Sequence, residues 1–124
     1  MKILVVDDEK DIKILFEQRF RKEIKTNLVE FKFAFSGEEA LNYLNLLDQE
    51  AVLILSDINM PGMNGLELLE KIKKKYTTPP PVVMMITAYG DAENRRTAIE
   101  LGADDFLTKP VDFTELKKKL NIAS

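Results

Sequence analysis

The chain has 124 residues, of which 45% are hydrophobic and 31% charged, and its formal net charge is −3. This length fits one domain with a buried core, and the composition excludes a disordered or fibrous protein. The slight negative charge gives no sign of direct nucleic-acid binding, and no apolar run approaches the ~20 residues of a membrane span. We therefore expect a single cytoplasmic domain over residues 1–124.

Two residue types are missing altogether, because the sequence contains no cysteine and no histidine. Disulfides, thiolate metal sites, the usual zinc ligands and Ser-His catalysis are thereby excluded. Any metal site in this chain has oxygen ligands.

Short apolar runs alternate with longer amphipathic runs along the whole chain. Strands are expected at 2–6, 29–35, 52–56, 82–86 and 105–108, and helices at 9–24, 37–47, 65–75, 92–101 and 112–121. Five successive β-α units predict a doubly wound (βα)5 protein of the α/β class, with a five-stranded parallel sheet between two layers of helices. The lysine runs at 73–75 and 117–119 lie at the C-terminal ends of two of these helices. There they are expected to face solvent and to interact favourably with the helix dipole.

The first strand raises the functional question, because "ILVVDDEKD" passes from buried apolar residues directly to acidic ones. In open parallel sheets, ligands bind outside the carboxyl ends of the strands, where the strand order reverses. The residues expected at those ends are Asp7, Asp8, Asp57, Thr87 and Lys109. If the first and third strands are neighbours, three carboxylates meet in one crevice, beside a hydroxyl and an ammonium group.

Three clustered carboxylates repel one another, at roughly 4 kcal/mol per pair for a separation of ~4 Å and an effective dielectric constant of about 20. A divalent cation would offset this repulsion, and oxygen ligands favour Mg²⁺, with Mn²⁺ as a possible substitute. Lys109 suits a phosphoryl oxygen, Thr87 can donate to another, and Asp57 is then a candidate nucleophile. Taken singly, these residues have ordinary explanations such as a helix cap or an Asx turn, but four strand ends together do not.

Four motifs resemble the receiver domain of two-component response regulators over essentially the whole chain. They are "VVDDE" at 5–9, "SDINMPGMNG" at 56–65, "ITAYG" at 86–90 and "GADDFLTKP" at 102–110. The resemblance implies a flavodoxin-like sheet with strand order 2-1-3-4-5. It also raises the expectation of a cis peptide bond between Lys109 and Pro110, although few X–Pro bonds are cis.

The resemblance also implies a role for each site residue. Asp57 is the expected phosphoacceptor, and Thr87 and Lys109 are expected to bind the phosphoryl oxygens. The implied metal ligands are Asp8 directly, Asp7 through water, Asp57, and the backbone carbonyl of Asn59. The implied switch residues are Thr87 and Phe106, and Asn59 and Tyr89 are expected to tune how fast water removes the phosphoryl group.

A receiver would take its phosphoryl group from the phosphohistidine of a sensor histidine kinase or a phosphotransfer protein. It would also catalyse its own dephosphorylation. Phosphorylation would change the surface formed by helix 92–101, strand 105–108 and helix 112–121. That surface would be read by an output domain, a downstream protein or a second copy of the chain.

Three other classes fit less well. A haloacid-dehalogenase-type phosphatase also uses a nucleophilic Asp, but it needs a second Asp two residues later, where this chain has Asn59. A flavodoxin or nucleotide-binding protein would carry a glycine-rich or Walker-type loop, and none is present. A degenerate receiver that acts only as a docking module would not need the complete acidic set with Lys109.

Overall fold

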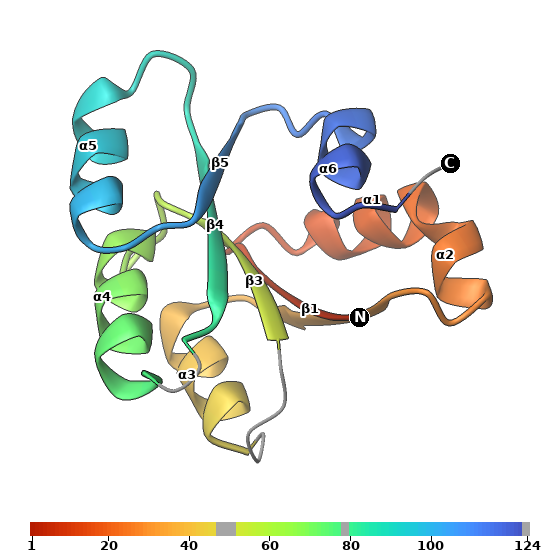
Figure 1. The fold of residues 1–124 in the computed structure, drawn as a ribbon, viewed down its shortest axis with the longest axis horizontal. Coiled ribbons are helices and arrows are strands. Elements are labelled where there is room, and N and C mark those ends of the chain that lie inside the picture. Colours follow the sequence, from red (N-terminus) through yellow and green to blue (C-terminus); the bar gives the residue numbers. More distant parts are fainter. Residues whose placement is uncertain (47–51, 78–79, 123–124) are drawn as a thin grey trace.

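Five parallel strands form one sheet in the computed structural model, which describes residues 1–46, 52–77 and 80–122 (Figure 1). The strands are β1 (Lys2–Val6), β2 (Glu30–Ala34), β3 (Val52–Asp57), β4 (Val82–Thr87) and β5 (Asp105–Thr108). Their order is β2-β1-β3-β4-β5, and all four pairings are parallel. The fold class and the strand order predicted above are therefore confirmed.

Helices cover both faces of the sheet. They are α1 (Asp11–Arg19), α2 (Arg21–Lys25), α3 (Gly37–Leu46), α4 (Gly65–Lys75), α5 (Ala92–Glu100) and α6 (Phe113–Lys119). Figure 1 shows α1, α2 and α6 on one side of the sheet and α3, α4 and α5 on the other. No helix among the described residues has the length and apolar character needed to cross a membrane.

Strand β1 shows why the apolar runs fold as strands between two helical layers. Ile3 and Val5 belong to the core cluster that includes residues of α1 and α6, whereas Leu4 and Val6 belong to the cluster that includes residues of α3, α4 and α5. Successive side chains of a strand point to opposite faces, so a continuous apolar run fills both cores.

The predicted helix at 9–24 is wrong in one respect, because the structure divides this segment into α1 and α2. The break lies at Phe20, whose φ and ψ of −108° and 21° are not helical. The Phe20 ring remains fully buried and stacks on Phe16 at 5.9 Å between centroids. The change of direction is compatible with this aromatic packing, and Glu23 of α2 pairs with Lys117 of α6.

The solvent-facing role predicted for the lysine runs is wrong for three lysines, whose side chains are mostly buried and form ion pairs. Lys73 Nζ lies 2.8 Å from Asp104 Oδ2, Lys117 Nζ lies 2.9 Å from Glu23 Oε2, and Lys119 Nζ lies 3.0 Å from Asp105 Oδ1. These contacts fasten helix ends to neighbouring elements. Residue 47 of the predicted helix 37–47 and residues 123–124 of the predicted domain lie outside the described part of the chain.

Candidate functional site

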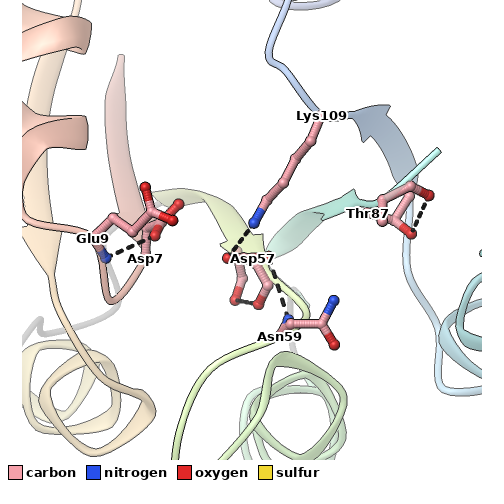
Figure 2. Close-up of polar contacts among 8 residues, drawn as sticks. Asp7, Glu9, Asp57, Asn59, Thr87 and Lys109 are labelled. Carbon is pink, nitrogen blue, oxygen red and sulfur yellow. Dashed lines mark hydrogen bonds and ion pairs between the residues drawn. The ribbon is translucent and has the colours of Figure 1, made fainter.

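Asp57 is the last residue of β3, and its side chain is only 2% exposed. Its Oδ2 atom accepts a hydrogen bond from Lys109 Nζ at 2.6 Å, and its Oδ1 atom accepts one from the backbone N–H of Asn59 at 3.3 Å (Figure 2). A carboxylate so deeply buried requires such partners, because desolvation strongly disfavours an unpaired charge.

The loop after Asp57 returns close to the strand that it leaves. A Cβ atom at Gly65 would lie 2.1 Å from the backbone oxygen of Asp57, so only glycine fits at this approach. The N–H of Gly65 donates to the carbonyl of Ile58 at 2.8 Å, and the N–H of Ile58 donates to the carbonyl of Ile86 at 3.2 Å. These contacts hold the loop that carries Asn59 against the end of the sheet.

The turn after β1 brings two more carboxylates to Asp57. One oxygen from each of Asp7, Asp8 and Asp57 lies within 4.8 Å of the others. Asp7 is buried and Asp8 is exposed. Burial raises the pKa of Asp7, and the charge of Asp57 raises it further, which together outweigh the hydrogen bond from the Glu9 N–H and the charge of Lys109.

Lys109 follows β5 and reaches across the sheet end to Asp57. Partial burial lowers the pKa of Lys109, but the hydrogen bond and charge of Asp57 outweigh this effect and hold the pKa above its ordinary value. The backbone N–H of Lys109 donates to the carbonyl of Thr87 at 2.9 Å, which aligns the ends of β4 and β5. The predicted cis peptide bond between Lys109 and Pro110 is present.

The remaining predicted residues differ in burial and in their position relative to this cluster. Thr87 ends β4 and is buried, and its hydroxyl makes a long hydrogen bond of 3.4 Å to the carbonyl of Ala88 rather than a bond to Asp57. Tyr89 and Asn59 are exposed, Tyr89 to 89%. Phe106 lies half-buried on β5, away from the acidic cluster and against the core beside α5.

Sequence reasoning gave no role to two residues that the structure brings to this region. Glu9 donates its backbone N–H to Asp7 Oδ1 at 2.9 Å, and its charge contributes to the raised pKa values of Asp7 and Lys109. The guanidinium carbon of Arg95 lies 4.7 Å from the centre of the Phe106 ring. The third acidic residue of "VVDDE" is a signal that points to Glu9, whereas no local pattern points to Arg95.

The donor set fits a small hard cation. Three carboxylates converge, one of them resists ionisation because of its surroundings, and the chain has no cysteine or histidine to favour a softer metal. Burial is the main cause of the raised pKa of Asp7, and the charge of Asp57 adds to it. A divalent cation would neutralise this repulsion, and it would leave coordination positions for phosphate oxygens.

The comparisons with known proteins agree with this geometry. The sequence model of the response regulator receiver domain matches residues 3–121. The chain belongs to this family. It is 38% identical over 119 residues to the transcriptional regulatory protein CpxR of Klebsiella pneumoniae, an alignment that covers 96% of this chain and 47% of that protein. The chain thus spans about half the length of the curated relatives it matches.

Solved receiver structures share the fold. The receiver domain of NtrX from Brucella abortus superposes with a TM-score of 0.79 at 36% identity, covering 96% of this chain and 94% of that one. A response regulator receiver protein from Pseudomonas putida superposes with a TM-score of 0.82 at 26% identity, covering 98% and 96%. This chain is a receiver domain of two-component signalling, and neither the phosphatase nor the docking-module alternative is favoured.

Proposed function

We propose that Asp57 accepts a phosphoryl group from the phosphohistidine of a sensor histidine kinase or a phosphotransfer protein. A carboxylate oxygen of Asp57 forms the new P–O bond while the P–N bond breaks and the imidazole leaves. One observation carries this proposal: the buried Asp57 carboxylate contacts Lys109 and lies beside the carboxylates of Asp7 and Asp8.

The proposed metal is Mg²⁺, with Mn²⁺ as a substitute. Its proposed ligands are the carboxylates of Asp8 and Asp57 and the backbone carbonyl of Asn59, with Asp7 acting through a water molecule. When bound, it neutralises negative charge on the phosphoryl oxygens. Lys109 is already within 2.6 Å of Asp57 and would move onto one of these oxygens. Thr87 would turn its hydroxyl from the Ala88 carbonyl, 3.4 Å away, toward another.

Removal of the phosphoryl group by water is the second reaction of this site. Asn59 and Tyr89 are exposed, so both lie where an incoming water or a partner would pass. We expect their side chains to set the phosphoryl lifetime, because the groups at the entrance decide how water approaches.

The activated domain would signal through α5, β5 and α6, where Phe106 and Arg95 lie. We infer that this surface is read in the cytoplasm by an output domain, a downstream protein or a second copy of the chain. The curated CpxR relatives, named as transcriptional regulatory proteins, make a regulator with an output domain the natural context. Residues 1–124 would then be its receiver domain.

The assignment of Asp57 is tested by incubating the chain with acetyl phosphate and MgCl2 and measuring its intact mass. The wild-type chain should gain one phosphoryl group, and Asp57→Asn should gain none. Asp11→Asn is the matched control, because Asp11 is an exposed aspartate in α1 outside the acidic cluster. Equal phosphorylation of Asp57→Asn and the wild type would show that another residue is the acceptor.

A further inference from the structure

Gly37 is the first residue of α3, and the side chain of Met63 packs directly against it. A Cβ atom at Gly37 would lie 2.7 Å from Met63 Sδ, 3.0 Å from Cγ and 3.1 Å from Cβ. Interiors are packed closely enough that such contacts force a displacement. Because the Met63 Cβ is attached to the backbone, rotation of the thioether alone would not relieve all three contacts.

Met63 belongs to the loop between β3 and α4, which also carries Asn59. The N–H of Ile58 ties the start of this loop to Ile86 of β4, and the N–H of Gly65 ties its end back to the carbonyl of Ile58. Between these ends, Met60 is buried and Met63 packs against the core cluster shared with α3 and α4. The contact with Gly37 therefore sets how closely this loop approaches α3.

The segment that leads into α3 is tied to the acidic turn as well. The carbonyl of Ala34 accepts the N–H of Asp7 at 3.1 Å. Ser36 then caps the start of α3, since its hydroxyl oxygen accepts the N–H of Glu39 at 3.1 Å. Residues 34–37 thus contact the turn that carries Asp7 through Ala34, and the loop that carries Asn59 through Gly37.

We propose that Gly37 is a positioning residue for the metal site. The absence of a side chain at Gly37 lets Met63 lie against α3, and this contact fixes the separation between the acidic turn and the backbone carbonyl of Asn59. The inference deepens the proposed function, because it concerns the same Mg²⁺ site. It predicts that a methyl group added at position 37 weakens the site without touching any ligand.

The test compares the wild type, Gly37→Ala, Met63→Ala and the double variant by NMR titration of their backbone amides with MgCl2. Gly37→Ala should weaken Mg²⁺ binding by about 10-fold, the lower end of what the loss of a supporting residue costs a metal site. Met63→Ala should weaken it less, because it loosens the loop without displacing it. The double variant should bind like Met63→Ala, because the added methyl group displaces the loop only by pressing on the long side chain of Met63.

A second readout is independent of metal. In the absence of Mg²⁺, the amide resonances of Asn59 and Gly65 should shift in Gly37→Ala relative to the wild type. In the double variant, they should lie close to their positions in Met63→Ala. Glu38→Ala is the matched control, because Glu38 is an exposed neighbour in the first turn of α3. It should leave both the Mg²⁺ affinity and these two resonances unchanged.

The inference is overturned if Gly37→Ala binds Mg²⁺ like the wild type with unshifted Asn59 and Gly65 amides, or if the two single effects multiply in the double variant. If Gly37→Ala does not fold, the double variant should fold and bind like Met63→Ala, and its failure to do so also overturns the inference. If the wild-type acidic turn does not respond to Mg²⁺, the proposed metal site fails, while the metal-free resonances still decide the role of Gly37.

Discussion

Lys109 Nζ lies 2.6 Å from Oδ2 of Asp57, although the two residues are 52 positions apart in the sequence. Asp57 is almost fully buried, whereas the Lys109 side chain is 37% exposed. The lysine therefore contacts the proposed acceptor from the solvent side, and under the proposed function it would move when a phosphoryl oxygen arrives. This pair supports both the stability of the folded chain and its proposed chemistry.

Lys109→Met should destabilise the metal-free protein by about 1.5–3 kcal/mol, the worth of a hydrogen bond to a charged group, with the lower half expected because Lys109 is partly exposed. Urea denaturation followed by circular dichroism measures the change. The double variant Asp57→Asn/Lys109→Met should recover most of the loss, because position 57 then no longer carries a buried charge without its partner. A Lys109→Met protein as stable as the wild type would contradict a stabilising pair.

The stabilisation by the Asp57–Lys109 pair should decrease at high pH. The folded pKa of Lys109 is raised above its unfolded value of 10.5, so the pair's contribution is complete below that value. It is lost as the pH rises through the higher folded pKa. Wild type and Lys109→Met should therefore converge in stability at strongly alkaline pH.

Asp7→Asn should stabilise the metal-free protein at neutral pH. The folded pKa of Asp7 is raised above 3.8, so the folded state holds its proton more tightly than the unfolded chain. Stability then falls as the pH rises from 3.8 through the folded pKa, and the full penalty remains above it. Asparagine removes the charge and keeps an oxygen that can accept the Glu9 N–H.

Thermal melts of Asp7→Asn and the wild type between pH 4 and pH 8 without Mg²⁺ measure this effect. The advantage of the variant should grow with pH and then level off. An Asp7→Asn protein that is less stable than the wild type at pH 8 would mean that the carboxylate has a structural role that outweighs its desolvation and the repulsion from Asp57.

Asp8→Ala should remove the stabilisation that Mg²⁺ provides while leaving the metal-free protein nearly unchanged. At a Mg²⁺ concentration 100 times the dissociation constant, a bound ion stabilises the wild type by about 2.7 kcal/mol. Asp8 is exposed, so its loss without metal should cost within about 0.5 kcal/mol. Melting temperatures with and without MgCl2 check both statements, with Asp11→Ala as the exposed control. A full Mg²⁺ response in Asp8→Ala would exclude it as a ligand.

The sheet and the strand-end residues were predictable because both follow from local pattern. Short apolar runs indicate β1, β3 and β4, and an alternating apolar and polar run indicates β2. The residues that follow parallel strands must meet at one edge of the sheet. Asp7, Asp8 and Asp57 could therefore be grouped before any contact was known. The strand order and the cis bond before Pro110 came from the family resemblance and not from periodicity.

Contacts between elements that are distant in the sequence, and the break between α1 and α2, had no such local signal. The Glu23–Lys117 pair, the Met63–Gly37 contact and the break at Phe20 depend on how whole elements pack, which side-chain periodicity does not encode. The sequence pattern around a lysine at the end of a helix is the same whether the side chain faces solvent or pairs with a carboxylate. The lysine runs were misjudged for this reason.

Lys117→Met should destabilise the protein by about 3–5 kcal/mol, because it leaves the buried Glu23 carboxylate without its cation. The Glu23 side chain is 6% exposed, and its Oε1 atom has no hydrogen-bond partner among the described residues. Lys118→Met is the matched control, since Lys118 is an exposed neighbour in α6. Urea denaturation at pH 7 should separate the two variants clearly.

The contribution of Glu23 to folding stability should change with pH in the opposite direction in Lys117→Met. Burial raises the pKa of Glu23, but the hydrogen bond from Lys117, a hydrogen bond from the backbone of Glu23 itself, and the charges of Lys117 and Lys22 together hold the pKa below 4.5. In the wild type, this contribution is present above 4.5 and is lost as the pH falls through the folded pKa. Without Lys117, burial acts on Glu23 unopposed by that cation, so stability should fall as the pH rises above 4.5. An unchanged pH profile would mean that Glu23 remains charged without the lysine.

The last prediction concerns the proposed switch of Thr87 and Phe106, and the effect of Arg95 on it. Arg95 lies over the half-buried Phe106 ring at 4.7 Å, a geometry worth about 0.5–1 kcal/mol at an exposed site. The Thr87 hydroxyl holds its present partner only at 3.4 Å, so new phosphoryl oxygens can attract it easily. Its movement would open space between β4 and β5 for the Phe106 ring. Arg95 therefore favours the ring position of this structure, and we expect phosphorylation to favour an inward position, in which the ring fills the space that Thr87 vacates.

Arg95→Met should raise the population of the inward Phe106 state in the unphosphorylated protein, by about 2- to 5-fold for the loss of about 0.5–1 kcal/mol. NMR spectra of the Phe106 ring and of α5 and α6 amides, with and without beryllium fluoride and MgCl2, measure this shift. Arg96→Met, an exposed neighbour in α5, should behave like the wild type. Thr87→Ala should still be phosphorylated at Asp57 but should respond weakly at α5 and α6, because the hydroxyl no longer moves. Identical Phe106 resonances in the free and beryllium fluoride forms would exclude this mechanism, since every step above requires the ring to change place.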